Sequence, residues 1–329
     1  MIVTFGNRCW HSLILGCAML SISGCYYMQA ARGQLDVMSK REPIDELIEA
    51  SDTPEELAAR LQLVSEARQF AIDKLLLPDN DSYRSYADLG RDYVVWNVFA
   101  APEFSLDPKT WCFPIAGCVA YRGYFSEDAA RRKADQLEED GLDVAVGGIP
   151  AYSTLGRFDD PVLNTMMHWE DVDLVATIFH ELAHQVLYVK NDSAFNESFA
   201  TTVEEIGIER WLTSRDQEAE LSDYIERRER RRKTMEVITV ARTDLEKLYA
   251  SSMATHEMRR AKESRFAQLA SELPVDFEIK LNNAQLASIG LYQSRVPEFR
   301  ALYEECEREL HCFYNQASSL QPAESSTQH

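Results

Sequence analysis

The most informative stretch of this sequence is His180-Glu181-Leu182-Ala183-His184, and Asn196-Glu197-Ser198-Phe199-Ala200 follows it closely. Residues four apart lie about one turn apart on the same face of a helix, so His180 and His184 can bind one metal ion through their imidazole nitrogens. A catalytic zinc typically has three protein ligands and a fourth position for water, and Glu197 would complete that set. Glu181 lies one step further round the helix, where it could act as general base toward the water.

The residues around this pattern predict two helices. Positions 171–188 have the spacing of an amphipathic helix, and a second helix of about 194–212 carries Glu197 in its first turn. The short connection between them lets the two helices pack antiparallel. The competing interpretation is that the histidines are solvated or capping residues and that Glu197 is a surface acid. It does not explain why two histidines share one face of a helix with so many apolar residues.

These residues carry a resemblance to known proteins. H-E-x-x-H followed by N-E-x-x-A on the next helix resembles the gluzincin metallopeptidases, the thermolysin and aminopeptidase type. The wider pattern resembles a bacterial lipoprotein family usually called putative aminopeptidases. The stretches that carry it are Trp111 to Cys118, Ala151 to Phe158, the two zinc helices, and Leu281 to Ala284. The resemblance covers most of the mature chain and implies a zinc-dependent peptidase. The aminopeptidase activity comes from the resemblance and not from the spacing.

One position departs from the thermolysin-like pattern. In those enzymes an aspartate four residues after the glutamate ligand orients a zinc histidine, but here that position is Thr201. Glu204 lies on about the same helix face as Glu197 and could replace the aspartate, since such outer groups fix the tautomer and orientation of a ligating imidazole. An ordinary surface acid is an equal alternative for Glu204.

The resemblance also implies a donor that stabilises the oxyanion of the reaction, namely a tyrosine from the helical region after the zinc helices. Tyr292 is our candidate, and a half-buried core tyrosine is its alternative. The predicted function is therefore zinc-dependent peptide hydrolysis, with Glu181 as general base. The alternatives are a zinc endopeptidase and a non-catalytic envelope lipoprotein that binds a partner through a gluzincin-like fold. The sequence does not identify the acids that would hold a substrate α-amine.

The N-terminus predicts an exported lipoprotein. Arg8 precedes a mostly apolar run, residues 13–22, which is too short to span a membrane. The run leads into Ile22-Ser23-Gly24-Cys25, which resembles a bacterial lipobox, so cleavage would leave Cys25 as a lipidated N-terminus. Tyr26 stands where an aspartate would resemble an inner-membrane retention signal. We therefore expect the outer membrane, facing the periplasm. An ordinary secretory signal with a coincidental cysteine is the alternative.

The mature chain is strongly acidic. Removal of residues 1–24 takes away one basic residue, Arg8, and no acid, so the net charge changes from −20 to −21. This charge argues against nucleic acid as a partner and against binding of anionic lipid through the fold. The expected partners are a peptide substrate and a membrane reached through lipid on Cys25.

Cysteine spacing predicts two disulfides. After Cys25, the mature chain contains Cys112, Cys118, Cys306 and Cys312. An even number of cysteines in an exported protein indicates disulfides, and these four allow three connectivities. We favour the two local pairs, Cys112–Cys118 and Cys306–Cys312, because the first loop contains a proline and a glycine that ease its closure.

The rest of the pattern predicts an α+β fold that is mainly helical. Gluzincin-like zinc helices would pack beside a small mixed sheet with strands at 93–100, 118–124 and 142–146, and with a helix at 126–140. Thr53-Pro54-Glu55-Glu56 predicts a capping box that opens a helix to about Leu77. Ala151 to Gly156 is either an edge segment that binds the substrate backbone or a plain connecting loop.

The C-terminal half predicts helices. Acids and bases at three- and four-residue spacing over 216–273 indicate a long charged helical hairpin, and 282–292 and 297–310 indicate two further helices. The predicted organisation is a lipoprotein signal peptide (1–24), a lead-in or tether (25–50), a metallopeptidase domain (51–315) and a disordered tail (316–329). The domain comprises a β-containing part (about 90–160), the zinc helices (about 171–212) and a helical C-terminal part (about 216–312).

Overall fold

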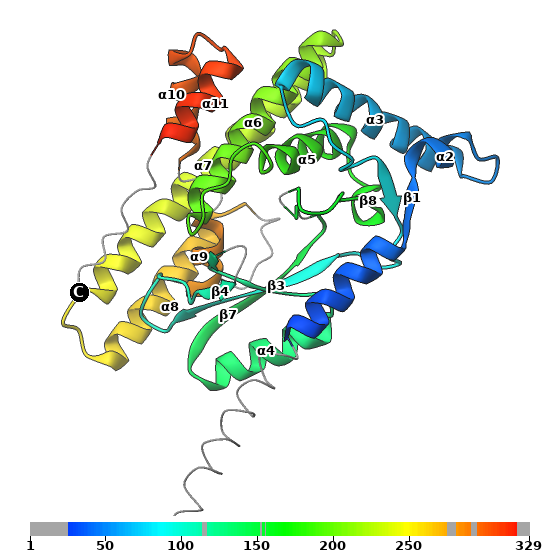
Figure 1. The fold of residues 1–329 in the computed structure, drawn as a ribbon. Coiled ribbons are helices and arrows are strands. Elements are labelled where there is room, and N and C mark those ends of the chain that lie inside the picture. Colours follow the sequence, from blue (N-terminus) through cyan, green and yellow to red (C-terminus); the bar gives the residue numbers. More distant parts are fainter. Residues whose placement is uncertain are drawn as a thin grey trace, which may run out of the picture.

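A computed structural model describes residues 26–113, 117–151, 153–154, 156–274, 281–290 and 295–320 of the chain. Helices dominate these residues and small sheets lie among them, so the predicted mainly helical α+β class is confirmed (Figure 1). No helix in these ranges is both long enough and apolar enough to cross a lipid bilayer.

The N-terminal elements are a helix at residues 26–39, β1 (Arg41–Pro43), α2 (Ile44–Glu49) and α3 (Glu55–Leu75). The described part of the predicted lead-in or tether (25–50) thus contains two helices and a short strand. Val37 and Ile44 are fully buried, and the Gln29 side chain hydrogen-bonds the backbone of Gly123 and Phe125. These contacts bind the segment to the rest of the fold and supply the burial that its sequence alone does not reveal.

Helix α3 begins later than predicted. Its N-cap is Pro54 and no side chain caps the helix, so the capping box expected from Thr53 does not form. Pro54 has extended backbone angles, φ −55° and ψ 135°, and it therefore lies outside the helix. The helix ends at Leu75 because Leu76 adopts a left-handed conformation with φ 57°.

Within the described ranges the strands form three small sheets. The first has the order β1-β2-β8, with β2 (Ser85–Ala87) antiparallel to β1 and parallel to β8 (Val162–Leu163). The second is antiparallel with the order β6-β3-β7, formed by β6 (Arg122–Tyr124), β3 (Val95–Pro102) and β7 (Leu142–Ile149). The third is the pair β4 (Trp111–Phe113) and β5 (Gly117–Val119).

The predicted single strand at 118–124 is wrong, because the chain forms two strands there that belong to different sheets. β5 pairs with β4, and the Cys112–Cys118 disulfide joins these two strands. β6 pairs instead with β3. The disulfide confirms the first predicted local pair.

The two faces of the β6-β3-β7 sheet have different neighbours. Val98 and Ala100 of β3 pack with Ala130 and Leu137 of α4 (Glu127–Glu139). The side chain of Ser126 caps this helix by accepting a hydrogen bond from the backbone N–H of Ala129, which confirms the predicted start. The alternate residues of β3, among them Asn97, face the opposite side because successive side chains of a strand alternate. That side looks toward the helices that carry the predicted ligands.

Helices α5 (Asp171–Ala183) and α6 (Ser193–Ser214) confirm the predicted helix pair, and they pack against each other (Figure 1). Asp192 caps α6 by accepting a hydrogen bond from the backbone of Phe195. α5 ends before the predicted residue 188, because the backbone N–H groups of Gln185 and Val186 donate to carbonyls only three residues back. The fully buried rings of Phe179, Phe195 and Phe199 belong to the main core.

The C-terminal elements are α7 (Glu218–Tyr249), α8 (Thr255–Glu272), α9 (Asn283–Gly290), α10 (Val296–Glu305) and α11 (Leu310–Ser319). The first two form the predicted charged hairpin and pack along each other (Figure 1). They share a small apolar core that includes Ile238, Leu245 and Leu269.

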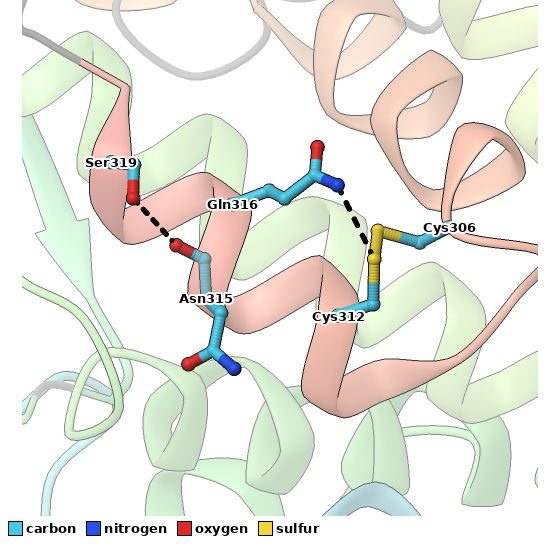
Figure 2. Close-up of a disulfide and its surroundings, with 5 residues drawn as sticks. All are labelled: Cys306, Cys312, Asn315, Gln316 and Ser319. Atoms are coloured by element: carbon cyan, nitrogen blue, oxygen red, sulfur yellow. Dashed lines mark hydrogen bonds between the residues drawn. A yellow bond between two sulfur atoms is a disulfide. The ribbon is translucent and has the colours of Figure 1, made fainter.

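The chain end departs from the prediction of a single helix at 297–310 and a tail from 316. A break at Glu307 and Arg308, which both have positive φ, separates α10 from α11. The Cys306–Cys312 disulfide bridges this break, as predicted, and Gln316 lies beside its sulfur (Figure 2). α11 continues to Ser319 because Ala317 is buried in the main core.

Candidate metal centre

The two helices bring the three predicted ligands together. His180 and His184 lie one turn apart on α5, and their ring centroids are 4.9 Å apart. The Nε2 atoms of His180 and His184 lie 3.5 Å and 3.8 Å from Oε2 of Glu197 on α6. One donor atom from each of the three residues lies within 4.8 Å of the others. These residues could therefore hold one metal ion.

The donor set fits a tetrahedral ion. Bond lengths of about 2.0–2.2 Å place neighbouring ligand atoms of a tetrahedral site roughly 3.3–3.6 Å apart, close to the distances between the two imidazoles and the Glu197 carboxylate. Two imidazole nitrogens and one carboxylate oxygen suit Zn²⁺ and related divalent transition metals. Three protein donors leave a coordination position open toward the cavity described below.

Glu204 contacts the outer nitrogen of one ligand. Its Oε2 lies 3.0 Å from Nδ1 of His180, so this carboxylate is in place to fix the ring and its tautomer. Glu204 follows Glu197 by seven residues, about two turns along the same face of α6. By contrast, Nδ1 of His184 is buried and has no hydrogen-bond partner among the described residues.

The charges in this cluster show how strongly it attracts a cation. Burial alone would lower the pKa of His180, but hydrogen bonds to Glu197 and Glu204 hold that pKa well above its usual value. Burial lowers the pKa of His184 to about 4, and the charge on His180 acts in the same direction. Burial would raise the pKa of Glu197, but its hydrogen bond to His180 and the two imidazoles keep that pKa low. The carboxylates thus hold a positive charge between them.

Glu181 lies beside the ligands and faces the same cavity. Burial raises the pKa of its carboxyl to about 7; His180 opposes this shift, whereas Glu197 and Asp160 add to it. Its proton affinity therefore suits a group that takes up and releases a proton near neutral pH.

Asp160 is an acid that sequence reasoning missed. It is 2% exposed, and burial raises its pKa to about 6. Its Oδ2 accepts a hydrogen bond of 2.7 Å from the backbone N–H of Thr154. Nothing in the local sequence marks this residue, because an Asp-Asp-Pro stretch ordinarily indicates an exposed turn.

A cavity of about 800 Å³ opens onto the ligands. The two ligand helices contribute His180, Glu181, His184, Glu197 and Glu204 to its lining, and the β6-β3-β7 sheet contributes residues that include Asn97 and Gly123. Among the described lining residues the acids are all glutamates and there is no lysine or arginine. Apart from the histidines, the charged residues of the described cavity wall are therefore acidic.

The helix at 26–39 forms a further wall of the cavity, which sequence reasoning missed. Tyr26, Ala30 and Gln34 line it at four-residue intervals, a spacing that could have indicated a helix face. The guanidinium of Arg122 lies 4.0 Å from the centre of the Tyr26 ring, and burial raises the pKa of Tyr26 to about 12. The residue after Cys25 therefore belongs to the wall of the site.

Several other predicted positions have mixed outcomes. Ala151 and Ser153 line the cavity, but the described residues of 151–156 form no strand. Tyr188 also lines the cavity, and burial raises the pKa of its hydroxyl. Tyr292, predicted to stabilise the oxyanion, and Cys25, predicted to carry lipid, lie outside the described residues.

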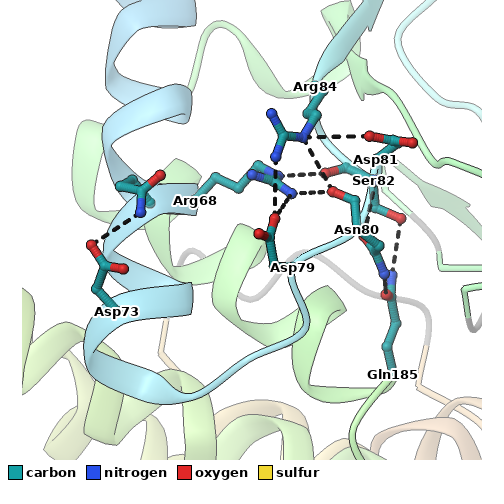
Figure 3. Close-up of polar contacts among 9 residues, drawn as sticks. Arg68, Asp73, Asp79, Asn80, Asp81, Ser82, Arg84 and Gln185 are labelled. Atoms are coloured by element: carbon teal, nitrogen blue, oxygen red, sulfur yellow. Dashed lines mark hydrogen bonds and ion pairs between the residues drawn. The ribbon is translucent and has the colours of Figure 1, made fainter.

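A polar cluster holds the end of the ligand helix. Gln185, the residue after His184, accepts a 2.6 Å hydrogen bond from Asn80 Nδ2 and donates to Ser82 Oγ at 3.2 Å. The buried Arg68 of α3 in turn donates to the backbone carbonyls of Asn80 and Ser82 (Figure 3). The loop after α3 is thus fixed, and it fixes the point at which α5 ends.

Comparison with known proteins gives one match. The model of a family described as "Putative aminopeptidase" matches residues 25–329. No curated protein and no solved structure matches the chain.

Proposed function

Because the chain belongs to the putative aminopeptidase family, we propose that it is a zinc-dependent peptidase of the gluzincin type that acts on free peptide N-termini. The observation that carries the proposal is the convergence of His180, His184 and Glu197 on one point, with Glu181 beside them in the same cavity. A structural cluster would not need a large cavity in front of it, whereas a hydrolase needs room for its substrate.

The chain's own residues can divide the chemistry between them. His180, His184 and Glu197 would hold the zinc ion, and Glu204 would keep the His180 ring in place. When bound, zinc would lower the pKa of water toward neutrality and polarise the scissile carbonyl. The Glu181 carboxylate would accept a proton from the attacking water and pass it to the leaving amine. A pKa near 7 suits both halves of that transfer.

The acidic lining supports an aminopeptidase over a carboxypeptidase. A free α-amine is cationic at neutral pH and would be attracted by Glu181 and Glu204, the described lining acids outside the three ligands. A free C-terminal carboxylate would be repelled by the same groups, and no arginine or lysine among the described lining residues would pair with it.

The experiment compares how the mature protein cleaves two matched peptides, one with a free N-terminus and one with an acetylated N-terminus. The proposal predicts zinc-dependent release of the first residue from a peptide with a free N-terminus, and little cleavage after N-terminal acetylation. Equal cleavage of both peptides at internal bonds would indicate an endopeptidase instead. Failure to cleave either peptide in the zinc-loaded protein would contradict hydrolysis and favour a binding role.

We further propose that lipid on Cys25 anchors the protein to the periplasmic face of the outer membrane. The lipobox-like Ile22-Ser23-Gly24-Cys25 supports this proposal. Tyr26, the next residue, lies in a helix that lines the cavity, so an anchor at Cys25 would keep the cavity close to the bilayer surface.

A further inference from the structure

Asn97 is a buried polar residue that the proposed chemistry does not use. It lies in the central strand β3, its side chain is 6% exposed, and it lines the cavity. Its carboxamide makes no hydrogen bond to any side chain or backbone group within the described ranges. The polar atoms of Asn97 are not among the described side-chain atoms that are fully buried without a partner, so the carboxamide can hydrogen-bond a molecule in the cavity.

The strands on either side leave room around this amide. Asn97 pairs directly with Gly123 on β6 and with Gly147 on β7, so neither neighbour places a side chain beside it on the same face. A Cβ at Gly123 would lie 3.1 Å from Asn97 Oδ1 and 3.0 Å from Val95 Cγ1. A Cβ at Gly147 would meet no atom within 4 Å. Gly123 therefore keeps the carboxamide uncovered on the cavity side.

The amide and the metal ligands line the same cavity. Asn97 comes from strand β3, and His180, His184 and Glu197 come from helices α5 and α6. A substrate placed between the ligands and the sheet would meet the uncovered carboxamide. That group offers both a donor and an acceptor and is uncharged, which matches the N–H and C=O groups of a peptide main chain.

We propose that Asn97 is a substrate-binding residue that hydrogen-bonds the main chain of the peptide at this site. Its Nδ2 donates to a substrate carbonyl, and its Oδ1 accepts from a substrate N–H. The contact holds the peptide against the sheet while its scissile bond lies at the metal group. The inference rests on the proposed function, because it places a peptide in the cavity.

Equilibrium binding tests this contact without relying on turnover. The background is the zinc-loaded Glu181→Gln protein, which should not cleave, and the probe is tri-leucine with a free N-terminus. Asn97→Ala should weaken tri-leucine binding at least about tenfold and leave the zinc content unchanged, since one side chain's hydrogen bonds to a ligand are commonly worth that much. Gly123→Ala should also weaken binding, because its methyl group would press on the carboxamide.

Gly147→Ala is the matched control, since it adds the same methyl group beside Asn97 where the space is open. It should bind tri-leucine as the background protein does. Equal binding by all the variants, or no binding of tri-leucine to the background protein, would overturn the role of Asn97. If a thermal unfolding measurement shows that the Asn97→Ala protein is not folded, the comparison of Gly123→Ala with Gly147→Ala decides the question.

Turnover separates this inference from the proposed function. With Glu181 present, Asn97→Ala should raise KM more than it lowers kcat, as expected when a contact made in the ground state is lost. Weakened binding in a protein that never hydrolyses peptides would contradict the proposed function and support the Asn97 contact. Normal binding by Asn97→Ala in an active peptidase would support the proposed function and contradict the Asn97 contact.

Discussion

The outer nitrogens of the two ligand histidines have different surroundings. Glu204 lies 3.0 Å from Nδ1 of His180, whereas Nδ1 of His184 has no hydrogen-bond partner among the described residues. A carboxylate in this position orients the ring and raises its basicity as a ligand. The electrostatic support for the metal is therefore concentrated on His180.

Replacing Glu204 should weaken metal binding without abolishing it. We predict that Glu204→Ala lowers zinc affinity about 10- to 100-fold, the usual effect of losing such an outer carboxylate. Competition with a chromogenic chelator measures the change. Glu218→Ala, which removes one exposed acid on α7, is the charge-matched control. Equal affinities in the two variants would show that Glu204 acts only as a surface acid.

Glu181 should be dispensable for the metal and essential for turnover. It adjoins the ligands without belonging to the group of three donors, and its pKa near 7 suits a general base. We predict that the Glu181→Gln protein keeps its zinc and that its kcat falls about 10²- to 10⁴-fold. Metal analysis and peptide kinetics on the same preparation check this. Peptide cleavage at the wild-type rate would contradict the mechanism.

Residues with a helical spacing were predictable, and isolated polar residues were not. The motif spacing of His180, His184 and Glu197 on two helices indicated that they would meet. Glu204 shares the helix face of Glu197, but a surface acid was an equal alternative for it. Asn97 lines the cavity, and the buried Asp160 acts on Glu181 only through its charge. A single polar residue in a strand or turn has no signal comparable to a helical spacing. Tyr292 stays a prediction.

At the scale of elements, one glycine allows the ligand helices to pack closely. A Cβ on Gly207 of α6 would lie 2.6 Å from Cδ2 of Phe179 on α5 and 2.8 Å from Cδ1 of Leu75 on α3. All three helices meet at this point in the main core. The absence of a side chain at Gly207 therefore helps to set the distance between the helices that carry the ligands.

Gly207→Ala should lower the free energy of unfolding. Overpacking of a core costs about 1–3 kcal/mol, which exceeds the gain of up to about 1 kcal/mol from placing alanine in a helix. Urea unfolding measures the difference, and Gly147→Ala, which enters open space, serves as a control. A Gly207→Ala protein more stable than wild type would mean that the helices separate easily and that their spacing is not tightly fixed.

Long periodic elements were predicted well and short ones were not. The helices at 171–183, 193–214, 218–249 and 255–272 have strong patterns of apolar or charged residues. The chain at 117–124 divides between two sheets because its first part pairs with β4 and its second part with β3. The helix at 26–39 is stabilised by packing against other elements, which its own composition does not indicate.

At the scale of the whole molecule, the proposed lipid anchor lies at the N-terminus. Cys25→Ala should abolish lipid labelling and either release the protein from the membrane or stall its precursor, because several acyl chains are what hold a lipoprotein on a bilayer. Metabolic labelling with a fatty acid and membrane fractionation check this. Unchanged labelling and unchanged fractionation would contradict the lipoprotein proposal.

The central claim is that His180, His184 and Glu197 together hold one catalytic zinc ion. The most direct test is the metal content of the purified mature protein, compared between wild type and Glu197→Gln, a variant that keeps the size of the side chain but removes its charge. We predict about one zinc per wild-type chain and loss of most of it in the variant. Wild-type protein that binds no zinc, or full zinc content in Glu197→Gln, would contradict this claim.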